Sequence, residues 1–68
     1  MQELREHIAS IVTKARIAKG MTVKELSKAS GVSERTIYYT ESAEKIMRAD
    51  SLSMVARALD IVIMLGGK

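Results

Sequence analysis

The chain has 68 residues, a formal net charge of +3 and an isoelectric point near 9.5. It contains no Cys, which excludes disulfides, thiolate metal sites and a cysteine nucleophile, and no Pro, Phe or Trp, which leaves a composition typical of helices. Apolar residues (47%) are too many for a disordered chain, and charged residues (28%) are too evenly spread for a membrane span. We therefore expect one folded, mostly helical domain. The first residues do not resemble a signal peptide, so we also expect a cytoplasmic protein without a membrane segment.

Apolar residues in the first quarter of the chain recur with the period of an amphipathic helix. They are Leu4, Ile8, Ile11, Val12 and Ala15. This stripe predicts a helix from about residue 2 to residue 18 that stops at Gly20.

Capping residues predict the next two helices. Thr22 and Glu25 form a Thr-x-x-Glu capping box, so a second helix should begin at Val23. Gly31 follows it as a residue that can take a positive φ at a helix end. Ser33 is the next good N-cap and predicts a third helix of about two turns.

The last third predicts a loop, a fourth helix and a short strand. Residues 42–47 have no clean period and indicate a loop, with a short helical turn as the alternative. The fourth helix should start near Asp50 or Ser51, because apolar residues then repeat with the helical period. These are Leu52, Val55, Ala56 and Leu59. The apolar run over 61–65, which has three β-branched members and precedes two Gly, favours a strand. A helical extension, or folding back onto the core, is the alternative.

Positive charge gathers in the first half of the chain. Its members are Lys14, Arg16, Lys19, Lys24 and Lys28, against the single acid Glu25. Such a run favours an anionic partner, although in a small protein a run of this density is more typical of a solvated helical face.

Two short helices joined by a tight glycine-containing turn form a helix-turn-helix arrangement. Ser27 supplies a small residue where the second helix should face the third, and Gly31 lies in the turn. Val32 and Ile37 can anchor the turn and the inner face of the third helix, and Ser33 lets its first turn approach DNA. Together these residues predict a helix-turn-helix motif at about 23–42.

The residues from Arg16 to Ile37, with Glu41 and the segment 52–59, resemble the lambda-repressor-like (Cro/C1, XRE-type) DNA-binding domain. The resemblance spans roughly residues 4–59. It implies an all-α bundle of four to five helices over 1–60 that places its third helix in the major groove. The segment 59–65 is similar to HipB-type antitoxins, whose fourth helix leads into a strand that pairs with its twofold mate.

The chain departs from the family pattern at five positions. Val23 stands where the family usually has Gln, Ala43 where it has Gly, and Met47 where it often has Pro. Ser30 and Thr40 are more polar than the usual occupants of their positions. The departures at 43 and 47 leave open whether the loop after the third helix is extended or helical.

The resemblance implies the base-reading residues, and helix N-termini and charge indicate the phosphate contacts. Residues that match base-reading positions are Glu34, Arg35, Thr36 and Tyr39. The candidates for phosphate contacts are Thr22, Lys24, Ser33, Tyr38 and Lys45. For the two tyrosines, one in the core and one on the surface is an equally good hypothesis. Arg16 and Glu41 are implied to form a structural salt bridge and not to contact DNA.

One recognition helix buries too little surface for specific binding, so we expect a homodimer on a palindromic operator. The residues expected to form the dimer contact, within a tail over 61–68, are Ile61, Val62, Ile63, Met64 and Leu65. The sequence therefore predicts a transcriptional repressor that binds double-stranded DNA, with no enzyme activity, metal or cofactor. The alternatives are an antitoxin that also binds a protein toxin, and a helix-turn-helix fold used only for protein interaction.

Overall fold

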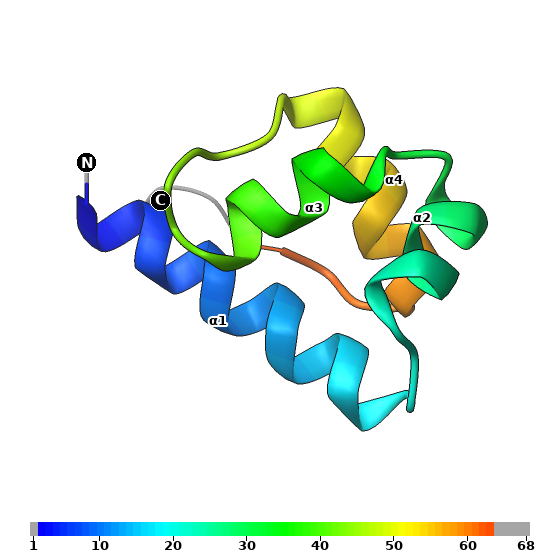
Figure 1. Cartoon of the computed structure of the whole chain (residues 1–68). Coiled ribbons are helices and arrows are strands. Elements are labelled where there is room, and N and C mark those ends of the chain that lie inside the picture. The colour runs from blue at the N-terminus through cyan, green and yellow to red at the C-terminus, as the bar shows by residue number, and fades with distance from the viewer. Residues whose placement is uncertain (1, 64–68) are drawn as a thin grey trace.

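The computed structural model describes residues 2–63, and this part of the chain forms four helices (Figure 1). They are α1 (Gln2–Ala18), α2 (Val23–Ser30), α3 (Glu34–Glu41) and α4 (Ala49–Leu59). Helices α3 and α4 each contact both α1 and α2. The expected all-α helix-turn-helix bundle is confirmed, with four helices in the described residues.

A single apolar core lies between the four helices. Every helix contributes at least one fully buried or nearly fully buried side chain to it, namely Ile8 and Val12 from α1, Leu26 from α2, Ile37 from α3, and Leu52, Val55 and Leu59 from α4. Val32, in the turn before α3, is also buried in this core, as the sequence predicts. Because each fully buried side chain of this size contributes about 1.5–3 kcal/mol, this core fixes how α3 is presented.

The two polar departures from the family pattern are buried, and both side chains are hydrogen-bonded. The Ser30 hydroxyl accepts from the Val32 N–H at 3.2 Å, and the Thr40 hydroxyl accepts from the Met47 N–H at 3.2 Å. The second bond ties the loop after α3 to the inner face of that helix. Burial of these hydroxyls therefore leaves neither of them unsatisfied.

The helix boundaries around the turn follow the predicted caps. The Thr22 hydroxyl accepts from the Glu25 N–H at 3.1 Å, and the Glu25 carboxylate accepts from the Thr22 N–H at 2.8 Å, which completes the capping box. Gly31 ends α2 with φ 79°, and the Ser33 hydroxyl caps α3 by accepting from the Thr36 N–H. The predicted starts at residues 23 and 34 are confirmed.

Helices α1, α3 and α4 end in the same hydrogen-bonded arrangement, the Schellman motif. In each, a residue with positive φ follows the helix, and the next N–H donates to a carbonyl five residues back. The positive-φ residues are Gly20 (φ 69°), Ala43 (φ 65°) and Asp60 (φ 61°). The corresponding bonds run from Met21 to Arg16, from Glu44 to Tyr39 and from Ile61 to Ala56.

The loop after α3 is open, so the helical alternative for residues 42–47 is wrong. Ala43 turns the chain out of the helix, and the N–H groups of Glu44 and Lys45 both donate to the Tyr39 carbonyl. The chain then runs without helical structure to Arg48 (yellow-green in Figure 1). Helix α4 begins at Ala49, slightly before the predicted start, with no side-chain hydrogen bond at its N-cap.

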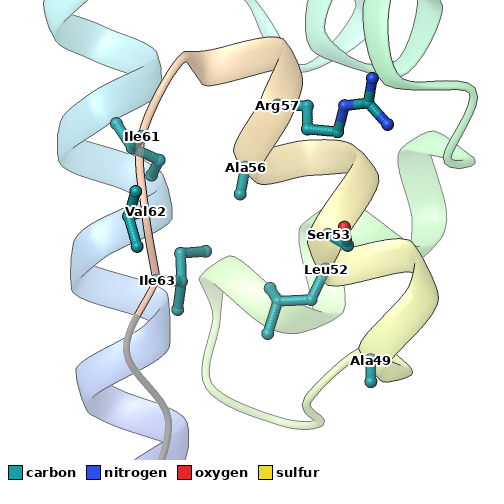
Figure 2. A pocket seen from close by; sticks show the side chains of 8 residues that line it. All are labelled: Ala49, Leu52, Ser53, Ala56, Arg57, Ile61, Val62 and Ile63. Atoms are coloured by element: carbon teal, nitrogen blue, oxygen red, sulfur yellow. The ribbon is translucent and has the colours of Figure 1, made fainter.

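Residues 61–63 turn back after α4 and run beside α1 (Figures 1 and 2). They form no strand, because a strand needs a partner and none lies within the described chain. Ile61 and Ile63 pack against the core, which is the fold-back alternative, whereas Val62 is 82% exposed. The other two residues of the predicted strand, Met64 and Leu65, lie outside the described residues.

Candidate nucleic-acid interface

The packing of α3 separates its inner face from its outer face. Ile37 and Thr40 are buried against the rest of the bundle, which fixes the rotation of the helix. The side chains predicted to read bases lie on the remaining surface. Glu34 and Arg35 are exposed, and Thr36 and Tyr39 are half-buried. The four residues therefore share one accessible helix.

Arg35 is free to donate hydrogen bonds outward. Within residues 2–63 its guanidinium makes no hydrogen bond or ion pair. A planar fork without an internal partner is the group that can donate two bonds to guanine O6 and N7. The neighbouring carboxylate of Glu34 is likewise uncommitted in the described residues and could accept from a cytosine amino group.

A hollow of about 460 Å³ lies between α3 and the loop that follows it. Its polar and charged lining residues are Arg35, Thr36, Tyr39, Thr40, Lys45, Arg48 and Ser51. Three of these are cations and none is a carboxylate, so the hollow attracts an anion such as a DNA phosphate. We call it the basic hollow.

Lys45 is held at the basic hollow by an aromatic ring. Its Nζ lies 5.4 Å from the centroid of the Tyr39 ring, within the range of a cation–π interaction. The Lys45 N–H also donates to the Tyr39 carbonyl at 3.3 Å. Lys45 is thus placed by its neighbours and is not merely a lysine extended into solvent.

The other phosphate candidates differ in how much of their hydrogen-bonding capacity remains. Thr22 uses its oxygen to cap α2 and keeps its hydroxyl proton, and Lys24 is exposed with no partner in the described residues. Ser33 instead donates its proton to the Thr36 hydroxyl at 3.0 Å and accepts from the Thr36 N–H at 3.2 Å. These two bonds engage the Ser33 hydroxyl inside the α3 cap.

Neither tyrosine belongs to the core, so the hypothesis of one core tyrosine and one surface tyrosine is wrong. Tyr38 is 58% exposed and Tyr39 is half-buried beside the basic hollow. The physical reason is that Ile37 and Thr40 occupy the inner face of α3. Both phenol groups therefore remain available to a partner.

Arg16 and Glu41 join the end of α1 to the end of α3. The Arg16 guanidinium donates from Nε to Glu41 Oε2 at 2.8 Å and from Nη2 to Oε1 at 2.9 Å, and it also donates to the Met21 carbonyl at 2.9 Å. The two side chains are only 16% and 11% exposed. The bond to Glu41 raises the pKa of Arg16, so this guanidinium stays charged at physiological pH. Both groups are committed to each other and not to a ligand.

Three residues at the start of α4 lie beside α3, although sequence reasoning did not assign them to the site. They are Arg48, Asp50 and Ser51, which line hollows together with residues of α3. The sequence signal that could have indicated them is the pair of charged residues, Arg48 and Asp50, that follows the predicted loop. Nothing local in the sequence, however, indicates that α4 begins next to α3.

In the described part of the chain, no group of three or more His, Asp or Glu side chains could hold a metal ion. No helix among residues 2–63 is long and apolar enough to cross a membrane.

Comparison with protein families gave one relevant match. A family model described as Helix-turn-helix matches residues 12–62, which is most of the chain and includes α2, the turn, α3 and α4. Comparisons with curated proteins and with solved structures gave no match.

Proposed function

Because the chain belongs to the Cro/C1-type (XRE-like) helix-turn-helix family of DNA-binding regulators, we propose that it represses transcription from a palindromic operator that it binds as a homodimer. In this proposal α3 lies in the major groove. Arg35 reads a guanine, and Glu34, Thr36 and Tyr39 contact neighbouring bases. The cytoplasm is the compartment in which such a regulator would act.

The observation that carries this proposal is that Arg35, whose guanidinium has no partner in the described residues, lies beside the basic hollow. The first supplies donors for a base edge, and the second supplies charge for the adjacent phosphate. Phosphate contacts from Thr22, Lys24, Tyr38 and Lys45 then fix the register of α3 on the duplex. Ser33 is a weaker phosphate ligand than these four, because its hydroxyl already makes two hydrogen bonds inside the cap.

The proposed dimer contact uses the segment after α4. An apolar groove of about 300 Å³ lies beside it, and Leu52, Ala56 and Ile63 are among its lining residues (Figure 2). Val62 lines the same groove and is 82% exposed. A twofold contact would place this segment of one copy against the same surface of the other, which buries apolar area from both.

Fluorescence anisotropy tests the proposal, with the DNA upstream of the gene compared with a scrambled duplex of equal length over a salt series. We expect a preference of about 10³-fold or more for the upstream duplex, because phosphate attraction alone cannot distinguish sequences. Weak binding to both duplexes that disappears near physiological salt would contradict the proposal. That result would favour a protein partner, such as the toxin of an antitoxin pair.

A further inference from the structure

A second hollow, of about 370 Å³, lies beside the first turn of α3. Ser33 and Thr36 line it from the α3 side, and Asp50, Ser51 and Met54 line it from α4. Thr36 and Ser51 also line the basic hollow, so the two hollows lie on either side of this pair. The second hollow contains a carboxylate and no cation, and we call it the acidic hollow.

The Asp50 carboxylate is held in place and still faces solvent. Its Oδ1 accepts from the Ser51 N–H at 2.8 Å and lies 3.6 Å from Arg48 Nε. The side chain is 73% exposed, so its remaining acceptor capacity is open to a ligand. Arg48 lines the basic hollow and Asp50 lines the acidic hollow, so the start of α4 presents opposite charges to the two adjoining hollows.

The one charged side chain that lines the acidic hollow is a carboxylate. Asp50 is negative, whereas the other polar lining side chains are the uncharged hydroxyls of Ser30, Ser33, Thr36 and Ser51. A phosphate is attracted by positive charge, so the Asp50 carboxylate opposes it here. An amino group needs acceptors, and the major groove presents amino groups at cytosine N4 and adenine N6.

We propose that Asp50 is a specificity-determining residue that keeps phosphate away from the start of α3 and selects a base amino group there. This inference rests on the proposed function, binding of double-stranded DNA through α3. Asp50 thereby weakens binding to duplexes in which no amino group lies at that position, and it raises the ratio of specific to non-specific affinity.

The test replaces Asp50 by Asn, which removes the charge but keeps the shape and an oxygen that can accept from the Ser51 N–H. Asp60→Asn is the matched control. It makes the same change in net charge at the other end of α4, about 15 Å away by helical rise, at a positive-φ position that Asn tolerates.

Each of the three proteins is used to select binders from a pool of duplexes with random sequence, and anisotropy then gives the affinity for a selected and a scrambled duplex. We expect Asp50→Asn to bind the scrambled duplex about threefold to tenfold tighter, because the charge is removed. We also expect its base preference to change at one position of each half-site, because the amide adds two N–H donors to the remaining acceptor oxygen. Asp60→Asn should select the same half-site as the unmodified chain.

Equal changes in both variants would overturn the inference, because net charge alone would then explain them. An unchanged half-site and unchanged affinities in Asp50→Asn would also overturn it while leaving the proposed function intact. If the unmodified chain enriches no sequence from the pool, the proposed function itself fails, and the role of Asp50 fails with it.

Discussion

Two exposed cations of the helix-turn-helix motif differ in the geometry of their charged groups. Arg35 has a planar fork on the recognition helix, whereas Lys24 carries a point charge near the N-terminus of α2. Both are exposed and neither has a partner in the described residues. A fork can distinguish one base edge from another, but a point charge near a helix N-terminus attracts any phosphate. Truncation of Arg35 should therefore change the base preference, whereas truncation of Lys24 should lower the affinity for every duplex.

We predict that Arg35→Ala weakens binding to the selected duplex by about 1–3 kcal/mol of binding free energy and relaxes the base preference at one base pair. Lys24→Ala should weaken binding to every duplex alike and lower the salt slope by about 1. Lys14→Ala, a cation on α1, is the control for loss of charge alone. Anisotropy on a set of single-base variants measures both quantities, and equal behaviour of Arg35→Ala and Lys24→Ala would remove the case for Arg35 as a base reader.

The sequence indicates some of these residues and not others. Outward placement of Arg35 follows from the predicted boundaries of α3, because Ser33 and Ile37 fix the helix start and its inner face. The pairing of Arg16 with Glu41 spans 25 positions, which no local period can predict, and only the family resemblance implied it. The position of Asp50 near α3 depends on how α4 packs, and sequence reasoning missed it.

At the scale of a helix and its ends, Ala43 is the clearest departure from local preference. It takes φ 65°, a region in which a Cβ is disfavoured, to close the Schellman motif at the end of α3. The conformation is retained because Thr40 and the Tyr39 carbonyl hold the following loop. Gly would adopt the same backbone without that conformational cost.

Ala43→Gly should therefore stabilise the fold by about 0.5–1 kcal/mol, which raises Tm by several degrees in a domain of this size. The same chemical change at Ala29, an exposed helical position in α2, should lower stability by about 0.5–1 kcal/mol. Thermal unfolding followed by circular dichroism measures both variants. A loss of stability in Ala43→Gly comparable to that in Ala29→Gly would show that the left-handed conformation is not costly at this position.

Helix boundaries were predictable where a side chain or a glycine determines them. Thr22, Gly31 and Ser33 each act within four residues, so their sequence signals are local. The start of α4 was predicted less exactly, because the Arg48 side chain at its N-cap makes no hydrogen bond to the first turn. The open loop depends on a left-handed Ala43, which alanine rarely adopts and local rules therefore do not favour.

For the molecule as a whole, the segment after α4 forms the contact in the proposed homodimer. Its apolar run was visible in the sequence, but its conformation depends on what it packs against. Ile61 and Ile63 pack against the core of their own chain, and Val62 is exposed to solvent. A short apolar run cannot by itself distinguish a strand between copies from a segment folded back on one copy.

We predict that Val62→Asn weakens self-association about tenfold or more. At concentrations too low for dimers it should leave Tm unchanged, since Val62 is exposed within the single chain. Ile17→Asn is the matched control, because Ile17 is also a large exposed apolar residue, but on α1. Sedimentation equilibrium at equal concentrations compares the two. If both variants dimerise as strongly as the unmodified chain, the contact lies elsewhere.

The division of α3 into a packed side and an open side has a consequence for how such a regulator can diversify. Ile37, Thr40 and Glu41 hold the helix in place, whereas the side chains of Glu34 and Arg35 make no hydrogen bond or ion pair in the described chain. Substitutions at the second pair therefore cost little stability, because the first three preserve the helix and its angle. Under the proposed function, a few point mutations at this pair would exchange one operator for another, and the chain need not pass through an unfolded intermediate sequence.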